Sequence, residues 1–249
     1  MTTQKTTMTT KPTRLKLLSQ GKAKDMYTSD QPGQLIMVFR DDMTAFNGEK
    51  KEAFDGKGAI NHRITEHLMG HLESMGIKTH YRAKIDETQC LVSALKMLPI
   101  ECVIRNIAAG GFAKRFGITP GEVLKEPIYE LFYKHDGLGD PMIRDEHALY
   151  FGWATEADLK EMKAITYRVN AILSERFLSC GMTLVDFKLE FGRLGNELFV
   201  ADEISPDSCR IWDNKQQDLT ARIMDKDRFR KGLGEVVEHY HKIGHRLGV

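Results

Sequence analysis

Charged residues alternate with apolar residues in the segment Met182 to Phe191, which reads MTLVDFKLEF. In an extended strand successive side chains point to opposite faces, so Asp186, Lys188 and Glu190 would share one face. The other face would be apolar and part of the core, with Val185, Phe187, Leu189 and Phe191. The charged face would present carboxylates and an ammonium group, which are groups that bind metal ions and phosphates.

A second run, Glu197 to Ile204, follows the turn sequence GRLGN and predicts a β-hairpin with the first strand. In an unbulged hairpin Asp202 would lie roughly opposite Asp186 or Lys188, and near Glu190. Mg²⁺ is usually held by one or two carboxylates together with substrate phosphates, so Glu190 and Asp202 are candidate magnesium ligands. The alternative is a two-faced sheet whose outer face is only solvated.

A basic turn, Gly21-Lys22-Ala23-Lys24, joins two predicted strands near the N-terminus. Its backbone N–H groups and its two ammonium groups could close over a polyphosphate. The turn is not the P-loop pattern G-x-x-x-x-G-K-[ST], and an ordinary basic hairpin is the alternative interpretation. The phosphate-binding interpretation gains weight only in combination with the acidic hairpin.

Two arginines are suited to anionic substrate groups. Arg105 ends a strong apolar strand and precedes the small residues Ala108 to Gly111, which would let backbone approach a ligand closely. Arg210 follows Pro206 and Asp207 in a loop, and its guanidinium fork matches carboxylate or phosphate. The alternative for Arg105 is an exposed strand end paired with solvent or a surface carboxylate. With the lysines and the acidic hairpin, these residues indicate an ATP-dependent enzyme acting on an acidic substrate.

Length and composition limit the class of protein. The chain has 249 residues, of which 41% are hydrophobic, enough for one large domain or two small ones. The 36 Lys and Arg nearly balance the 35 Asp and Glu, so no global charge attracts nucleic acid or an anionic membrane. Four cysteines without a C-x-x-C pair argue against structural zinc and disulfides, and favour a reducing cytoplasm. No apolar run approaches transmembrane length.

The N-terminal half predicts a sheet covered by a helix. Residues 1–14 are Thr-rich and basic, and we expect a disordered tail, with a short transit peptide as the alternative. Short strands follow at 15–18, 25–28 and 34–40. Apolar residues every four positions between Gly58 and Gly76 predict an amphipathic helix. Two further strands, 90–97 and 100–107, are separated by Leu98-Pro99, and we place the boundary between two lobes there.

The C-terminal half predicts two helices around the hairpin. Residues 108–116 predict a glycine-containing turn and a short helix, and the segment from there to about Trp153 is expected to be irregular. Thr155 and Asp158 form a capping-box-like start to a long helix that ends at Gly181. A last amphipathic helix is expected from Asp227 to Leu247.

Several long strings give the chain a resemblance to a known family. These strings are GKAKDMY, ECVIRNIAAG, DPMI, LVDFKLEFG, ADEISPDSCRIWD and MDKDRFRKGLG. From about Leu15 to Val249 the chain closely resembles the SAICAR synthetases of purine biosynthesis. The resemblance implies an α+β fold with an N-terminal antiparallel sheet lobe, kinase-like in shape, at 15–98. It also implies a C-terminal ATP-grasp-like lobe at 99–249, with ATP in the cleft.

The resemblance also implies a reaction. Carboxyaminoimidazole ribonucleotide would condense with L-aspartate to give SAICAR, while ATP is cleaved to ADP and phosphate through an acyl phosphate. ATP and Mg²⁺ are the implied cofactors, and the partners are small-molecule substrates, without nucleic acid or membrane. A cytoplasmic homo-oligomer, such as a dimer, is expected.

Residue roles follow from the matching positions. The resemblance implies ATP contacts from Lys22, Ala23, Lys24 and Lys134, with the segment 97–102 near adenine. It implies magnesium ligation by Glu190 and Asp202, whose carboxylates also serve the nucleotide site. The implied catalytic residues are Lys188, Arg210 and Asp207, and the implied substrate-binding residues are Arg105, Gly111, Arg210 and Asp207.

Three positions depart from the family pattern. Gly111 stands where the family usually shows serine, Cys209 stands at the serine before arginine in the family's PDSSR or PDGSR, and Asn47 stands where aspartate is common. A lost hydroxyl hydrogen bond is worth about 1 kcal/mol, so each change could weaken substrate binding without abolishing it. The alternatives are therefore a paralogous amide ligase with a different amine or carboxylate substrate, and a nucleotide-binding protein without turnover.

Overall fold

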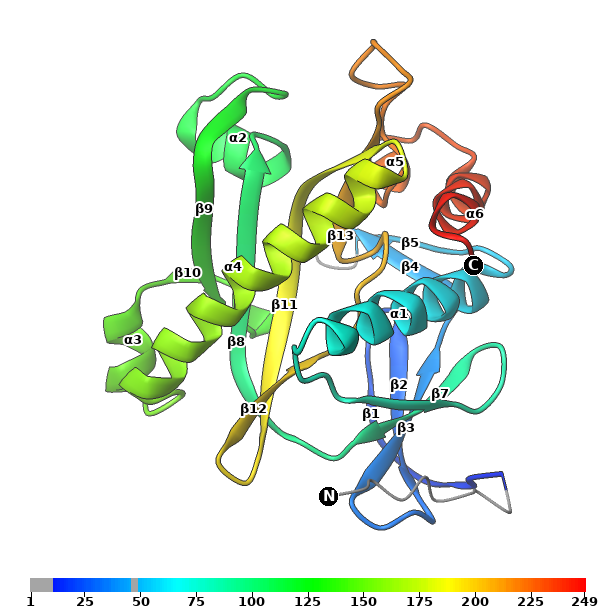
Figure 1. The fold of residues 1–249 in the computed structure, drawn as a ribbon, viewed down its shortest axis with the longest axis vertical. Helices are drawn as coiled ribbons and strands as arrows, with labels where there is room; N and C mark the ends of the chain where they lie inside the picture. The colour runs from blue at the N-terminus through cyan, green and yellow to red at the C-terminus, as the bar shows by residue number, and fades with distance from the viewer. Residues whose placement is uncertain (1–10, 46–48) are drawn as a thin grey trace.

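Two large antiparallel sheets dominate the structure, a computed structural model that describes residues 11–45 and 49–249 (Figure 1). Each sheet has a long helix across one face, and the two helices also approach one another. Every strand ladder in the described ranges is antiparallel. The protein therefore has the mixed α+β class that the sequence predicts. Asn47 and the first ten residues lie outside the described residues.

The first sheet has the strand order β1-β2-β3-β7-β6. Its strands are β1 (Arg14–Gln20), β2 (Lys24–Ser29), β3 (Gln34–Phe39), β6 (Tyr81–Lys84) and β7 (Gln89–Ser93). The three predicted N-terminal strands are confirmed, and the helix predicted after Gly58 is α1 (Lys57–Ser74). The apolar stripe of α1 is fully buried, as a four-residue repeat requires: Ile60, Ile64, Leu68 and Leu72. A small sheet pairs β4 (Asp42–Ala45) with β5 (Lys50–Ala53).

Residues just before the first sheet are already part of the fold. Pro12 is buried, the backbone N–H of Thr13 donates to Asp30, and the Lys11 ammonium pairs with Asp86 at 3.1 Å. Residues 11–14 of the segment expected to be a tail thus have defined contacts with the first sheet and its loops.

The second sheet has the order β10-β9-β8-β11-β12, with β13 also paired to β11. Its strands are β8 (Lys96–Ile107), β9 (Val123–Tyr133), β10 (Met142–Ile143), β11 (Met182–Leu194), β12 (Glu197–Ala201) and β13 (Cys209–Asp213). The central strand β11 pairs with three neighbours, because β12 takes its end and β13 its beginning on the edge opposite β8. This strand is therefore held along its whole length.

We expected Pro99 to separate two strands. It lies inside β8 instead. Proline has no N–H to donate, and it is tolerated here because the pairing of β8 with β11 shifts register between Met97 and Glu101. The Pro99 carbonyl accepts a hydrogen bond from the Lys134 N–H at 3.0 Å. The two predicted strands are real, but β7 belongs to the first sheet and β8 to the second.

The expectation of an irregular segment up to Trp153 was wrong. The segment contains β9, β10, the short 3-10 helix Asp136–Leu138 and the helix α3 (Asp145–Tyr150). The strand β9 reads VLKEPIYELFY, and its outer half is exposed and polar with a proline in the middle. A half-exposed edge region of this kind lacks the clean apolar alternation from which strands are predicted. Before it lies the short helix α2 (Gly110–Phe116), as expected.

The long predicted helix is confirmed as α4 (Glu156–Ser179), which lies across β11 and β8 (Figure 1). Thr155 caps it, accepting from the Asp158 N–H at 3.2 Å, and Asp158 accepts the Thr155 N–H at 2.8 Å in return. Its buried face packs against the apolar face of the second sheet. The opposite face of β8 and β11 is left for polar side chains.

The single C-terminal helix expected from Asp227 to Leu247 is instead two helices. They are α5 (Asp227–Arg230) and α6 (Val236–Leu247). Gly232, Gly234 and Glu235 between them have positive φ angles of 66°, 68° and 50°. Residues in the left-handed conformation end a helix. The apolar periodicity continues across this break in the sequence, but the two glycines could have indicated where the helix ends.

Candidate active site

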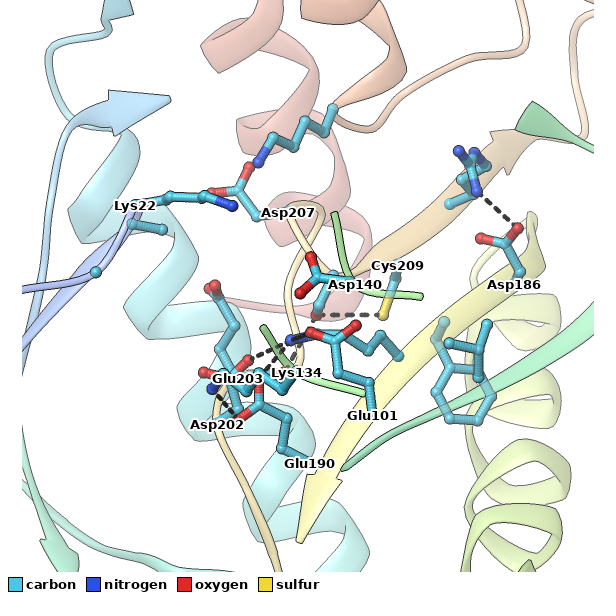
Figure 2. Close-up of a pocket in the computed structure, with 18 of the residues that line it drawn as sticks. Lys22, Glu101, Lys134, Asp140, Asp186, Glu190, Asp202, Glu203, Asp207 and Cys209 are labelled. Atoms are coloured by element: carbon cyan, nitrogen blue, oxygen red, sulfur yellow. Dashed lines mark hydrogen bonds and ion pairs between the residues drawn. The ribbon is translucent and has the colours of Figure 1, made fainter. Parts of the chain in front are cut away.

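A cavity of about 450 Å³ opens between the Gly21 turn of the first sheet and the strands of the second sheet (Figure 2). Its walls come from the turn at Gly21, from β8 and β11, from the loop between β12 and β13, and from the start of α5. The predicted site residues that line it are Lys22, Ala23, Lys24, Arg105, Lys134, Lys188, Glu190, Asp202, Asp207 and Arg210. Gly111 is the one predicted site residue in the described chain that does not line it.

The register of β11 against β8 puts charged side chains side by side on one face. Asp186 pairs with Arg105, and Glu190 pairs with Glu101, with Lys188 between them on β11. Strict alternation holds from Asp186 to Glu190, as predicted. It fails at Val185, where β11 shifts register against β13 and Val185 packs with Ile107 and Trp212 instead of sharing the core face of Phe187.

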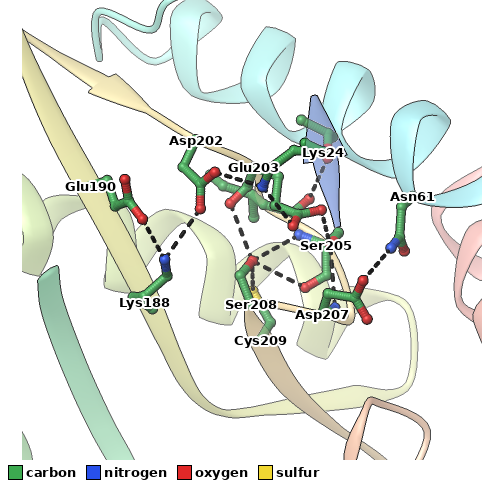
Figure 3. A network of polar contacts seen from close by, with 12 residues as sticks. Lys24, Asn61, Lys188, Glu190, Asp202, Glu203, Ser205, Asp207, Ser208 and Cys209 are labelled. Carbon is green, nitrogen blue, oxygen red and sulfur yellow. Dashed lines mark hydrogen bonds and ion pairs between the residues drawn. The ribbon is translucent and has the colours of Figure 1, made fainter. Parts of the chain in front are cut away.

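One end of the cavity is rich in lysine, and Lys188 is at its centre. We call it the lysine end and define it as Lys24, Lys134 and Lys188 with Glu101, Glu190, Asp202 and Glu203. The Lys188 ammonium lies 2.6 Å from Glu190, 3.1 Å from Glu101 and 3.2 Å from Asp202. Figure 3 shows Glu190 and Asp202 pointing at it from two sides. Burial alone would lower the pKa of Lys188, but these carboxylates raise it well above its ordinary value. Lys188 is therefore a permanent cation here.

Asp202 reaches this end from just beyond β12. Glu190 pairs with Ala201 across the hairpin, so Asp202 follows the last paired residue, and its φ of 64° turns it out of the strand. Its carboxylate bridges Lys188 and Lys24, with the Lys24 ammonium at 2.5 Å. Burial would raise the pKa of Asp202, but the two lysines hold it well below its usual range. Asp202 thus meets Glu190 through a shared lysine, not as its cross-strand neighbour.

His80 fixes the backbone of Asp202 from behind. Its Nε2–H donates to the Asp202 carbonyl oxygen at 2.8 Å, and the ring is buried. Burial, which the Asp202 charge only partly offsets, lowers the pKa of His80 to about 4. The ring is neutral at pH 7 and acts as a fixed hydrogen-bond donor.

Two further lysines face the same end. The Lys134 ammonium lies 2.5 Å from Glu190, and the Lys24 ammonium lies 2.7 Å from Glu203. Lys22 pairs at 2.8 Å with Asp136, which is largely exposed at the mouth of the cavity. Polyphosphate could be bound here only if lysines exchange their carboxylate partners for phosphate oxygens.

The arginine end of the cavity, Arg105 and Arg210 with Asp186 and Asp227, is built differently. Both arginines donate to the same Asp186 oxygen at 2.8 Å. Arg105 also donates to Glu130 at 2.9 Å, and Arg210 to Asp227 at 2.8 Å. Burial would lower the pKa of Arg210, but Asp186 and Asp227 raise it, and in turn the pKa of Asp227 falls to about 2. Each guanidinium is held by two carboxylates.

Gly110 is required by the position of Arg210. A Cβ atom on Gly110 would lie 2.2 Å from Arg210 Nη2, and the residue has a φ of 50°. Any side chain here would displace the guanidinium. Gly111 has open space around it and an exposed position on α2, so the close approach predicted for the small-residue run takes place at its neighbour.

Asp207 lines the cavity, but its carboxylate is fully engaged. One oxygen accepts from Lys57 and Asn61, both at 2.9 Å, and the other from Tyr240 at 2.7 Å. Burial would raise the pKa of Asp207, but the charges of Lys57 and Lys226, together with its hydrogen bonds, hold it well below its usual range. The group is a poor proton acceptor and a good anchor for the loop. Cys209 also lines the cavity, and burial raises the pKa of its thiol.

The donor chemistry of the lysine end suits a hard cation bound together with phosphates. Glu190 and Asp202 present carboxylate oxygens to one point, where Lys188 now lies. No group of three or more His, Cys, Asp or Glu in the described residues is arranged to hold a metal alone. Mg²⁺ commonly takes only one or two carboxylates and completes its shell with phosphate oxygens and water. The two carboxylates fit that pattern.

Sequence reasoning missed several residues of the site. Glu101 and Glu203 complete the carboxylates around the lysines, Asp227 holds Arg210, and Lys57 holds Asp207. Glu101 could have been found, because it shares strand parity with Arg105 in β8. Lys57 lies 150 positions from Asp207, and nothing local in the sequence connects them.

Known proteins share this chain's sequence and fold. The family model described as SAICAR synthetase matches residues 17–247. A phosphoribosylaminoimidazole-succinocarboxamide synthase of Coxiella burnetii is 51% identical over 238 residues, 96% of this chain and 98% of its own. The crystal structure of a synthase of that name from Ehrlichia chaffeensis has a TM-score of 0.90 and 44% identity, over 94% of this chain and 98% of its own.

A SAICAR synthetase solved in complex with ADP has a TM-score of 0.87 and 44% identity, over 92% of this chain and 96% of its own. With the match over nearly the whole length, the resemblance expected from the motifs is confirmed. The chain belongs to the SAICAR synthetase family, the ATP-dependent ligases that form an amide bond between carboxyaminoimidazole ribonucleotide and aspartate in purine biosynthesis.

Proposed function

We propose that this chain joins the carboxylate of carboxyaminoimidazole ribonucleotide to the amine of L-aspartate through an acyl phosphate. The observation that carries the proposal is the cavity itself, in which two carboxylates, a central lysine, a basic turn and two arginines converge. These groups match a reaction of three anionic substrates.

The finer architecture belongs to the same proposal. We assign residues 15–98 to a kinase-like sheet lobe and residues 99–249 to an ATP-grasp-like lobe, with ATP between them. The division is supported by the two sheets, because β7 is the last strand of the first and β8 the first strand of the second. The cavity draws its lining from both sides of this division.

The nucleotide would lie at the lysine end. Lys22, Ala23 and Lys24 would contact its phosphates from the Gly21 turn, and Lys134 would approach from the far side. Glu190 and Asp202 would hold Mg²⁺, which when bound would neutralise charge on the phosphates. On binding, the metal would take the place of the ammonium groups beside the carboxylates. Phosphate oxygens would take the place of the carboxylates beside the ammonium groups. This exchange conserves the pairing of charges.

The chemistry at the carboxylate follows from its poor reactivity. An oxygen of the ribonucleotide carboxylate attacks the γ-phosphorus of ATP, and the bond to the β-phosphate oxygen breaks, releasing ADP. The aspartate nitrogen then attacks the acyl carbon, a C–N bond forms, and the C–O bond breaks with inorganic phosphate as leaving group, which takes up the proton that the nitrogen loses. Lys188 would stabilise negative charge on the transferred group, and Arg105 and Arg210 would hold anionic groups of the ribonucleotide. Asp207 would position the loop that carries Arg210.

The test is release of ADP by the purified protein with Mg-ATP, carboxyaminoimidazole ribonucleotide and L-aspartate. We expect ADP release that requires both other substrates, and loss of at least about 100-fold in Glu190→Gln, which removes a charge at nearly constant volume. Turnover with a different amine but not aspartate would support a paralogous ligase. ATP binding without any turnover would contradict ligase activity, and wild-type turnover by Glu190→Gln would contradict the metal assignment.

We place the protein in the cytoplasm as a homo-oligomer. No helix of the described ranges has the length and apolar character needed to cross a membrane. All four cysteines are free, which suits a reducing compartment. Exposed leucines on the edge strand β1, at positions 15, 17 and 18, are suited to a subunit contact. Light scattering coupled to size exclusion tests the oligomeric state.

A further inference from the structure

Lys226 differs from every other basic residue that lines the cavity. The eight basic side chains there are Lys22, Lys24, Arg105, Lys134, Lys188, Arg210, Lys226 and Arg230. Seven of them form an ion pair with a carboxylate. For Lys226, no carboxylate oxygen in the described part of the chain lies within the 4.0 Å ion-pair distance. Lys226 is therefore the one basic side chain of the cavity lining, among the described residues, without a direct ion pair.

The surroundings explain why this charge is not neutralised from within. Lys226 immediately precedes α5, and its backbone N–H donates to the Pro206 carbonyl, which ties it to the loop of Asp207. Asp207 attracts its ammonium, but the oxygens of that carboxylate already accept three hydrogen bonds. Glu203 also attracts it, while Arg230 and Lys57 repel it.

Burial lowers the pKa of Lys226, and Asp207 and Glu203 do not fully compensate. An ammonium group that is partly removed from water without gaining a direct carboxylate partner is disfavoured. An anionic ligand in the cavity would remove that cost. The free site is thus prepared for a carboxylate or phosphate oxygen beside Asp207.

Six of the seven paired cations divide between two of the three substrates of the proposed reaction, and this inference rests on that proposed function; the seventh, Arg230, pairs with Asp227. Lys22, Lys24, Lys134 and Lys188 surround the acidic end suited to Mg-ATP, and Arg105 and Arg210 form the other end. The third substrate, aspartate, carries two carboxylates and needs a cation of its own. We infer that Lys226 binds a carboxylate of the incoming aspartate and selects an acidic amine donor over a neutral one.

The experiment compares Lys226→Met with Lys226→Arg and with the control Lys231→Met, in the full chain. Lys231 is exposed, follows α5 directly and does not line the cavity, so it gives the same chemical change outside the site. For Lys226→Met we expect the KM for L-aspartate to rise about 10- to 100-fold, the effect of losing one charge-assisted hydrogen bond. The KM values for ATP and for the ribonucleotide should change less than threefold. Lys226→Arg should recover part of the loss, and Lys231→Met should match the wild type.

A specificity measurement separates recognition from damage to the fold. In the wild type kcat/KM for L-aspartate should exceed that for L-asparagine, and in Lys226→Met this ratio should fall by the same 10- to 100-fold. An unchanged ratio would overturn the inference, as would equal rises in the KM of all three substrates. Loss of kcat with an unchanged KM for aspartate, unrescued by arginine, would mean that Lys226 transfers a proton instead. Absence of aspartate-dependent ADP release in the wild type would refute the proposed function. That outcome is distinct from a failure of the Lys226 inference, which is judged from the variants.

Discussion

The lysine end and the arginine end of the cavity hold their charges in different ways. At the lysine end each carboxylate of Glu190 and Asp202 meets two ammonium groups, and Lys188 meets three carboxylates. At the arginine end two guanidinium groups share one oxygen of Asp186, and each also donates to a second buried carboxylate. The first arrangement is a cluster of point charges and the second is a set of directed forks.

The difference teaches which end can exchange partners. An ammonium group has no fixed direction of bonding, so Lys24 or Lys188 can move from a carboxylate to a phosphate while a metal ion takes its place. Arg210 is fixed by Asp186, by Asp227 and by the backbone of Gly110 against its guanidinium. The lysine end is suited to a ligand that brings its own cation, and the arginine end to a ligand that arrives as a bare anion.

The largest effect on stability is expected for Lys188→Met, which leaves three carboxylates facing one another. Breaking a buried ion-pair cluster on one side costs about 3 kcal/mol or more. Urea unfolding at pH 7 should show that loss in the free energy of unfolding. Millimolar Mg²⁺ should then raise the melting temperature of Lys188→Met more than that of the wild type, because the metal can take the vacated position.

An equal response of both proteins to Mg²⁺ would contradict a hard-cation site at Glu190 and Asp202. Na⁺ at matched ionic strength is the control for general screening. This measurement needs no substrate and no turnover.

Arg210→Lys should lose about 2 to 3 kcal/mol of unfolding free energy, although it keeps the charge. A lysine cannot donate to Asp186 and Asp227 at once, so one buried carboxylate is left without that partner. Chemical denaturation measures the loss, and the KM for the ribonucleotide should rise in parallel. Wild-type stability in this variant would show that the two-directional donation of the Arg210 guanidinium does not matter. The arginine end would then hold its charges as the lysine end does.

His80→Gln should reduce the sensitivity of the protein to acid. The folded pKa of about 4 lies below the ordinary value of 6.5, so protons bind the unfolded chain more tightly and stability falls as pH drops through this window. At pH 5 the wild type should have lost about 2 kcal/mol from this group, and at pH 7 almost nothing. Unfolding curves of both proteins at pH 7 and pH 5 should therefore converge on acidification; parallel losses would refute this.

Lys22→Met should have the smallest effect on stability, below about 1 kcal/mol, because its pair with Asp136 is exposed. The KM for ATP should nevertheless rise if the Gly21 turn contacts phosphates. Thermal unfolding and ATP titration of the same preparation separate the two effects. A stability loss as large as that of Lys188→Met would mean that exposure does not distinguish Lys22 from the lysines of the lysine end.

Much of the fold could be predicted from local patterns. The long helix α4 has a capping box and a regular apolar stripe, and the hairpin of β11 and β12 has an alternating pattern and a Gly-Asn turn. These signals are contained within about twenty residues. The missed strand β9 and the broken C-terminal helix show the limit, because β9 is shaped by its pairing with β8 and the break depends on three left-handed residues.

The site was predictable where charge and strand parity combine, as for Asp186, Lys188 and Glu190. It was not predictable where partners are distant in sequence. Asp207 is an example, because Lys57 and Tyr240, which donate to its oxygens, come from α1 and α6. The bulge at Val185 also escaped prediction, since a one-residue shift leaves no trace in composition.

The strand β11 has a consequence for the size of its ligands. Asp186 and Glu190 lie four residues apart on one extended segment, which spans about 13 Å at the usual rise. Because the strand is hydrogen-bonded on both edges, the distance between these two residues is fixed. A molecule that touches both ends of the cavity at once has to match that length, and a shorter or longer analogue would reach only one of them.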